Sequence, residues 1–114
     1  MIIELPWPHK SLSPNARVHR MVKYRVGKRH REWAQWASCS YGPIEADEVH
    51  VTIVASPPTR AAFDDDNFIA RCKPYLDGIS DSLEVNDSKF RIQPLRRGEP
   101  VKNGAVRFEI EVPE

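Results

Sequence analysis

Hydrophobic and polar residues alternate along several stretches of this chain, as side chains do on the two faces of a β-strand. The alternation is clearest near the end of the sequence, where charged residues separate Val106, Phe108 and Ile110. Prolines end or interrupt these stretches, because proline cannot donate to a strand ladder. We therefore expect strands at residues 1–7, 48–55, 89–95 and 106–112.

A helical period replaces the alternation between residues 67 and 83. Apolar residues there recur about every 3.6 positions, a spacing that buries one face of a helix. Asp66 or Asn67 is expected to cap the start of this helix. Pro74 is expected to kink it, because proline removes one backbone donor and crowds the preceding turn.

A second helix is predicted over residues 32–41, which a Gly-Pro pair follows. Trp33 and Trp36 fall on one face of it, and we favour core packing over stacking on nucleic-acid bases for both. Residues 17–31 mix basic and apolar positions. A basic loop, a hairpin through Gly27 and the lead-in to the helix all fit that stretch.

The predicted elements follow one another as strand, helix, strand, helix, strand, strand. This order favours an α/β fold with a mixed sheet of about four strands and two main helices. A chain of 114 residues is expected to form a single domain, residues 1–114. Without an apolar run of roughly 20 residues or a signal-peptide layout, a cytoplasmic protein is expected. Cys39 and Cys72 should then remain reduced.

Charge is distributed unevenly, although the net charge is only +1. Basic residues gather between residues 10 and 31, acidic residues between 45 and 87, and a second basic group follows from 89 to 102. This pattern suits an enzyme that holds a cation at its centre and binds phosphates at its rim. A solvated surface with uneven charge explains the pattern equally well.

Carboxylates cluster where the longer helix is expected to begin. Asp64 and Asp66 are two residues apart, so on an extended segment both face one side and Asp65 faces away. Asp87, before the next strand, would complete a set of oxygen ligands that suits Mg²⁺. Mg²⁺ held in this way activates water for phosphodiester hydrolysis. Lys73 is placed to meet the phosphate as a compact cation.

Purely structural roles compete with this site. Three aspartates at a helix start are also favoured by the helix dipole and by free N–H groups. Lys73 and Asp77 have the spacing of a surface ion pair, and Asp87 can simply belong to a turn. The four histidines are expected to be surface or packing residues, although His19 and His30 lie among basic residues that suit nucleic-acid contact.

The order of these motifs resembles that of the RusA family of Holliday junction resolvases over most of the chain. The motifs are Leu5-Pro6-Trp7-Pro8, Asn15, a basic run through Arg17, His19 and Arg20, Asp64-x-Asp66-Asn67, Lys73, Leu76-Asp77 and Asp87-Ser88. Two departures are a longer spacing from Asn67 to Lys73 than in the best-known members, and Asn86 where many members have Asp. The second departure weakens metal binding or shifts its preference.

The resemblance implies a homodimeric endodeoxyribonuclease that requires Mg²⁺ or Mn²⁺ and acts in DNA recombination and repair. Such enzymes cut four-way junctions by paired, symmetric nicks. The resemblance implies that Asp64, Asp66 and Asp87 are catalytic metal ligands and that Lys73 is the essential lysine. Contacts with branched DNA are expected from Asn15, Arg17, His19, Arg20, Lys23, Arg25, Lys28 and Arg29.

Symmetry and shape agree with this reading. A junction has two equivalent strands to cut, and a two-fold dimer offers two equivalent sites. Junction shape and deformability would then dominate recognition.

Two other functions fit the same residues. One is a non-catalytic nucleic-acid-binding module in which the acids only cap and repel, and the other is a metal-dependent nuclease that acts on flaps or forks.

Overall fold

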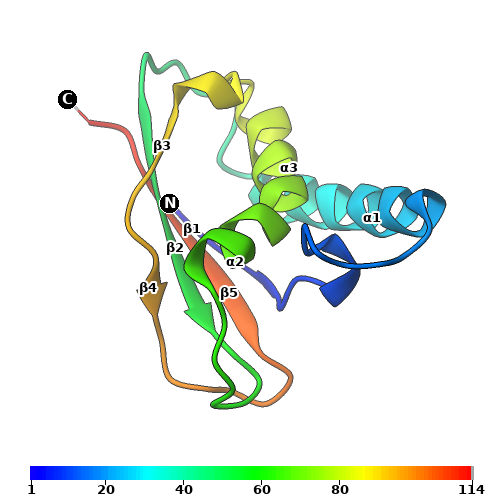
Figure 1. Ribbon diagram of the computed structural model, residues 1–114. Helices are drawn as coiled ribbons and strands as arrows, with labels where there is room; N and C mark the ends of the chain where they lie inside the picture. Colours follow the sequence, from blue (N-terminus) through cyan, green and yellow to red (C-terminus); the bar gives the residue numbers. More distant parts are fainter. Residues whose placement is uncertain (114) are drawn as a thin grey trace.

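Among residues 1–113, which the computed structural model describes, five strands form one sheet and three α-helices pack against one of its faces (Figure 1). The strands are β1 (Ile2–Pro6), β2 (Val49–Ser56), β3 (Phe90–Ile92), β4 (Arg96–Arg97) and β5 (Ala105–Glu111). The helices are α1 (Arg20–Ser38), α2 (Asp65–Arg71) and α3 (Lys73–Leu83), with 3₁₀ turns η1 (Lys10–Leu12) and η2 (Asp87–Lys89). The predicted α/β class is confirmed.

The sheet is mixed, as the sequence predicts. β5 lies between β1 and β2 and is antiparallel to both, whereas β3 and β4 run parallel to β2 along its other edge. β3 pairs with residues 49–51 of β2, and β4 pairs with residues 54–55. The strand predicted there, which Pro94 was expected to interrupt, is two short strands. Pro94 lies in the gap because it has no N–H to donate.

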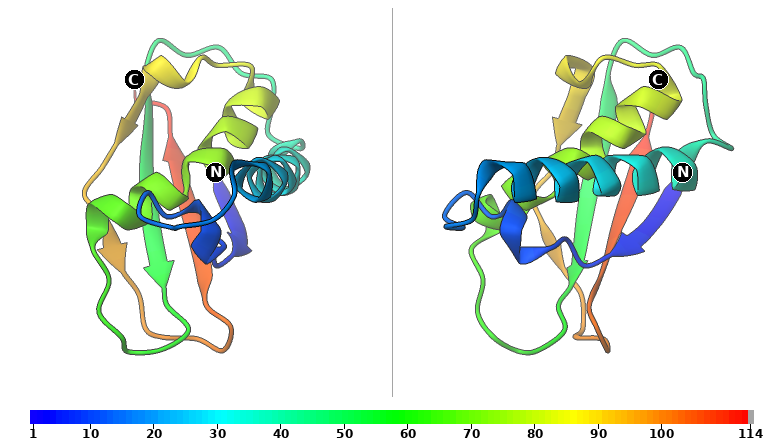
Figure 2. Two further views of the ribbon diagram at one scale, coloured as in Figure 1. Left: turned by 45° about the vertical axis from the view of Figure 1, so that its right-hand side comes forward. Right: turned by 90° about the vertical axis from the view of Figure 1, so that its right-hand side faces the viewer.

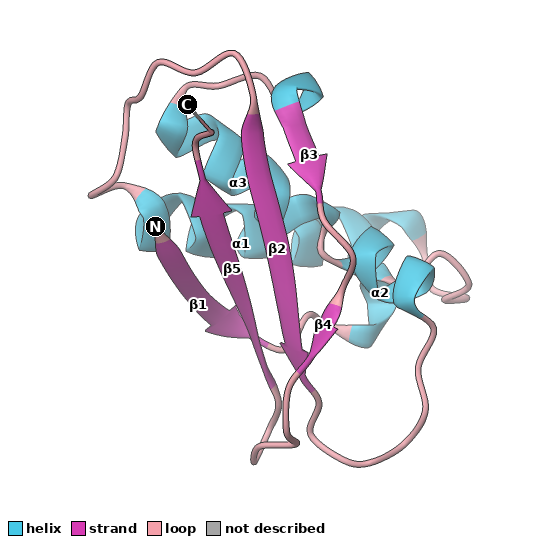
Figure 3. Cartoon of the chain, turned by 90° about the vertical axis from the view of Figure 1, so that its left-hand side faces the viewer, coloured by secondary structure: helices cyan, strands magenta, loops and turns pink. Residues whose placement is uncertain are grey.

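Alternating residues of the three long strands point toward the helices and form the core. Ile3 of β1 and Ile53 of β2 both pair in register with Phe108 of β5, and all three are almost fully buried. Tyr75 of α3 packs edge-on against Phe108, with ring centroids 5.9 Å apart. Figure 3 views the opposite face of the sheet, which no helix of the described chain covers.

The first helix is longer than the sequence predicts. α1 begins at Arg20 instead of residue 32 and ends at Ser38 (Figure 2). Of the three alternatives for residues 17–31, the lead-in to a helix is therefore correct for most of the stretch. Its buried positions are His30, Ala34 and Ser38. The prediction that Trp33 and Trp36 pack in the core is wrong, because the two residues are 41% and 83% exposed. Small and polar residues on the buried face hid the helical period.

The helix predicted over residues 67–83 is two helices that separate at Cys72. Pro74 lies in the first turn of α3, where a missing N–H leaves no intrahelical hydrogen bond unmade. The expected kink is therefore a complete break. The start of the helix also differs from the prediction, because Asp64, and not Asp66 or Asn67, is the N-cap.

The helices remain short or strongly charged. None of those in the described part of the chain is both long and apolar enough to cross a membrane. Cys39 and Cys72 are free thiols. Cys72 is buried against the sheet, and burial raises the pKa of its thiol, so Cys72 behaves as a small apolar core residue.

Candidate functional site

Two groups of charged side chains contain all four residues that the sequence assigns to catalysis. The first, at the start of α2, is the α2 acid cluster, which consists of Asp64, Asp65 and Asp66. The second joins α3 to η2 and is the lysine-centred cluster, which consists of Lys73, Asp77 and Asp87. The two groups differ in what each carboxylate contacts.

Each carboxylate of the α2 acid cluster has a different environment. Asp64 Oδ1 accepts a hydrogen bond from the N–H of Asn67 at 3.1 Å, so Asp64 caps the helix. Asp65 forms an ion pair with Arg97 of β4. Asp66 is exposed, and its carboxylate has no ion-pair or hydrogen-bond partner among residues 1–113. Capping therefore explains Asp64 but does not explain Asp66.

The expectation that Asp64 and Asp66 face one side of an extended segment is wrong. Asp65 and Asp66 already belong to α2, where successive side chains are rotated by about 100° instead of 180°. Asp65 meets the sheet edge, where Arg97 donates to the carbonyl oxygen of Phe63 at 2.7 Å and lies over its ring. Asp65 and Arg97 therefore anchor the start of α2 to β4.

Lys73 holds the lysine-centred cluster together. Its Nζ donates to Asp77, one turn later on α3, and to Asp87 Oδ2 at 2.8 Å. Both hydrogen bonds raise the pKa of Lys73, and the one to Asp77 has the larger effect. The hydrogen bond from Lys73 lowers the pKa of the Asp87 carboxyl. Lys73 therefore stays a cation and Asp87 an anion at neutral pH. The alternative surface ion pair of Lys73 with Asp77 is present.

The structure brings Lys73 and Asp87 together but does not join Asp87 to the α2 acid cluster. Among the 113 described residues, no group of three or more His, Cys, Asp or Glu side chains is arranged to hold a metal ion. Asp87 instead faces Lys73, which comes from α3 and lies 14 residues earlier in the chain. Metal binding by Asp64, Asp66 and Asp87 stays a prediction.

The residues predicted to contact DNA lie in the loop before α1 and along the first half of that helix. Seven of the eight are exposed, and Lys23 is half-buried. None of the basic ones forms an ion pair within residues 1–113, whereas the arginines of β4 and β5 do. His19 also has a structural role, because its Nδ1 accepts the N–H of Met21 and caps α1. This end of the molecule therefore presents uncompensated positive charge.

His30 is buried, so the expected packing role is confirmed and the alternative of nucleic-acid contact does not hold for it. Its Nε2 accepts the N–H of His9 at 3.1 Å, which leaves Nδ1–H to donate to the carbonyl of Val26 at 2.9 Å. Burial lowers the pKa of His30. The neutral ring thus attaches the loop at His9 to α1.

A hollow between α1 and α3 was missed by the sequence reasoning. It has a volume of about 330 Å³ and is lined by Lys23, Tyr24, Gly27, Lys28, Arg31, Pro74 and Asp77. Tyr24, Lys28 and Arg31 are spaced i, i+4 and i+7, which places them on one helix face. That signal becomes readable only when residues 17–31 are known to be helical.

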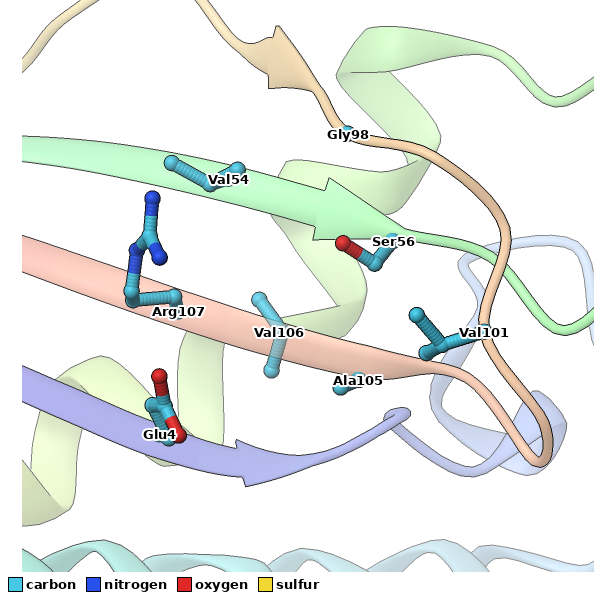
Figure 4. Close-up of a pocket in the computed structure, with 8 residues that line it drawn as sticks. All are labelled: Glu4, Val54, Ser56, Gly98, Val101, Ala105, Val106 and Arg107. Carbon is cyan, nitrogen blue, oxygen red and sulfur yellow. The ribbon is translucent and has the colours of Figure 1, made fainter.

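Another hollow lies on the uncovered face of the sheet (Figure 4). Its volume is about 380 Å³, and Glu4 and Arg107 are the charged residues that line it, among small and apolar neighbours such as Val101. Arg107 also pairs with Glu109 at 2.9 Å. No residue that the sequence assigns to a site lines this hollow, so it is separate from both charged clusters.

The chain is similar in sequence to a bacterial protein. No family model matches the chain. The chain is 41% identical, over 115 aligned residues, to an uncharacterized protein of Xylella fastidiosa (strain Temecula1). The match covers 95% of this chain and 74% of that protein.

Proposed function

We propose that this chain, which belongs to the same family as the Xylella fastidiosa protein, is a divalent-metal-dependent endodeoxyribonuclease that resolves four-way DNA junctions. The observation that carries the proposal is the contact between Lys73 Nζ and Asp87 Oδ2, at 2.8 Å. It joins the last aspartate of the motif to the helices that carry the other motif residues. Capping alone gives no reason for this contact.

The proposed ligands are all carboxylate oxygens, a chemistry that suits a hard divalent cation. Asp64, Asp66 and Asp87 would hold Mg²⁺ or Mn²⁺ through oxygen atoms, which both ions prefer. The Asp66 carboxylate has no partner among residues 1–113. The helix cap uses Oδ1 of Asp64, and the contact with Lys73 uses Oδ2 of Asp87. When bound, such an ion supplies a water of lowered pKa and relieves charge on the phosphodiester.

Lys73 orients the scissile phosphate in this proposal. The Lys73 side chain is 58% exposed, and exposed ion pairs contribute little to stability. Exchange of one carboxylate for a DNA phosphate therefore costs little. The raised pKa of Lys73 keeps the ammonium group charged during this contact, so Lys73 acts as a cation and not as a base.

The basic half of α1 and its preceding loop bind the arms of the junction. Each lysine or arginine that neutralises a duplex phosphate releases counterions, so the slope of log affinity against log salt steepens by about 0.9 per contact. A homodimer would present two such surfaces and two sites to the two equivalent strands. Shape and deformability of the junction then decide recognition.

A specific observation favours a second candidate, a non-catalytic nucleic-acid-binding module. Within residues 1–113 no three metal-ligating side chains form a group, and Arg97 and Lys73 already compensate the charge of Asp65 and Asp87 without any metal. In that case the basic surface binds nucleic acid and the acids only cap and repel.

The deciding experiment incubates the purified protein with a synthetic four-way junction and with a matched linear duplex, each with and without Mg²⁺. Paired nicks in the junction that require Mg²⁺ support the proposal. Equal cutting of the junction and of the linear duplex indicates a metal-dependent nuclease without junction preference. Binding without cutting, unchanged by Mg²⁺ or Mn²⁺, overturns the proposal and supports the binding module.

A further inference from the structure

We propose that the hollow between α1 and α3 binds one unpaired nucleotide, with its base on the ring of Tyr24 and its phosphate between Lys23 and Lys28. The inference rests on the proposed function only in taking nucleic acid as the ligand. It adds a second contact point beside the phosphodiester site and assigns it a ligand class, a single nucleotide outside a duplex.

Gly27 lines the hollow, and Gly78 lies where α1 and α3 approach each other closely. At Gly78 of α3 the helices pack closely, because an added Cβ would lie 2.7 Å from the Cβ of Ala34. Two turns earlier on α1, Gly27 leaves space, and an added Cβ there would lie 3.7 Å from Pro74 Cγ. The hollow that results, about 330 Å³, is at the lower end of ligand pockets, which run from about 300 to 1,000 Å³. It suits a nucleotide and is too small for a duplex.

The apolar part of the hollow fits a base. Tyr24 is 63% exposed, and its hydroxyl has no hydrogen-bond partner in the described part of the chain, so packing does not explain its position. Pro74 and Gly27 supply an apolar floor beside the ring. Every base has a π-face that stacks on an aromatic ring whatever its sequence.

The charged part of the hollow fits a phosphate. Lys23 and Lys28 have no ion-pair partner within residues 1–113. The other two charged lining residues are already neutralised. Arg31 forms a bidentate pair with Asp81, at 2.6 and 2.8 Å, and Asp77 pairs with Lys73. The charge available to a ligand is therefore that of the two lysines that line the hollow.

The hollow adjoins the lysine-centred cluster, because Asp77 belongs to both. A nucleotide held there would lie beside Lys73, next to the phosphate that the proposed reaction requires. Taking a base out of a duplex costs least where pairing or stacking is already interrupted. The hollow therefore selects DNA with a branch or a gap over continuous duplex.

The first test uses a short single-stranded oligonucleotide with one 2-aminopurine, in EDTA so that no cutting occurs. Stacking on Tyr24 quenches 2-aminopurine emission, and Tyr24→Ala should weaken binding about tenfold and abolish the quenching. Tyr24→Phe keeps the ring and should bind within twofold of wild type. Trp36→Ala, an exposed aromatic on the same helix outside the hollow, is the matched control and should change nothing.

The second test measures salt dependence on the same oligonucleotide. Lys23→Ala and Lys28→Ala should each reduce the slope of log affinity against log salt by about 0.7, the value for one single-strand phosphate contact. Lys102→Ala, in the turn before β5, should leave the slope unchanged. Circular dichroism spectra and melting curves establish that each variant is folded.

Two results overturn the assignment of the hollow: wild-type affinity and quenching in folded Tyr24→Ala, or equal losses in Tyr24→Ala and Trp36→Ala. Failure of the proposed function gives a different result. If the protein never cuts junctions but Tyr24→Ala weakens oligonucleotide binding, the proposed nuclease function is wrong and the assignment of the hollow stands. If Tyr24→Ala cuts junctions as well as wild type and binds the oligonucleotide with unchanged affinity, the proposed nuclease function stands and the assignment of the hollow is wrong.

Discussion

The α2 acid cluster and the lysine-centred cluster contain the same kind of side chain but compensate charge in opposite ways. At the start of α2 the negative charges have separate partners: Asp64 accepts a backbone N–H as the helix cap, and Asp65 pairs with Arg97. Asp66 faces solvent without a partner among residues 1–113. Around Lys73, one ammonium group serves two carboxylates. Carboxylates close together in sequence can thus have separate roles, while distant ones share a partner. Availability to a metal or a phosphate depends on these partners.

The largest effect is expected from Asp66→Asn. We expect it to reduce Mg²⁺-dependent junction cutting by about 10²- to 10³-fold, the usual consequence of removing one group that stabilises charge in the transition state. Asp64→Asn and Asp87→Asn should also reduce Mg²⁺-dependent cutting. Asp64→Asn should not destabilise the start of α2, because asparagine is also a good helix cap. Single-turnover cleavage assays measure the rate.

The control for this prediction lies in the same cluster. Asp65→Asn removes a carboxylate that Arg97 already neutralises, so its cutting rate should change far less. Junction binding in EDTA should stay the same or tighten in all four variants, because each loses negative charge near DNA. If Asp65→Asn and Asp66→Asn lose activity equally, the contrast within the α2 acid cluster does not exist.

Lys73→Met tests the other cluster and should have the next largest effect. Loss of one charge-assisted hydrogen bond to phosphate corresponds to a decrease of about 10- to 100-fold in cutting. Mn²⁺ affinity, measured by calorimetry, should not decrease, because two carboxylates lose a competing cation. The pKa of Asp87, followed by NMR, should rise. Lys89→Met is the control, and weaker Mn²⁺ binding in Lys73→Met alone would contradict the proposed role.

The position of the lysine-centred cluster depends on helix packing, and two glycine variants test this. Gly78→Ala places a methyl group against the backbone and Ala34 of α1, which should destabilise the protein by about 1–3 kcal/mol. Gly27→Ala meets Pro74 at ordinary contact distance and should stabilise it by up to about 1 kcal/mol through helix propensity. Urea denaturation measures both. Equal stability of the two variants would show that α1 and α3 do not pack closely at Gly78.

The smallest effect is the pH dependence of stability that His30 contributes. His30 belongs to neither charged cluster. The pKa of His30 lies below its usual value of 6.5 because the ring is buried. The unfolded chain therefore takes up this proton first. Stability is complete above pH 6.5 and falls, by at most about 1.4 kcal/mol per pH unit, as pH decreases from 6.5 to the lowered folded pKa. His30→Gln should remove this part of the slope in denaturation curves at pH 5 to 7, and an unchanged slope would assign it to other groups.

Local pattern predicted much of the fold. The alternation at residues 106–112 predicts β5, and the period after Asn67 predicts α3. These features depend on neighbours in the sequence. The beginning of α1 was not predictable in this way, because its basic residues face solvent and its buried positions include His30 and Ser38.

The sequence by itself determined which residue types were available: the acidic stretch at residues 64–66, Asp87, Lys73 and the basic region before residue 32. Only the tertiary structure decided their partners. Asp65 meets Arg97 across 32 residues and Lys73 meets Asp87 across 14, because the sheet and the break at Cys72 bring those segments together. Composition and spacing cannot supply such distances, since charge acts over a few ångströms in space and not along the chain.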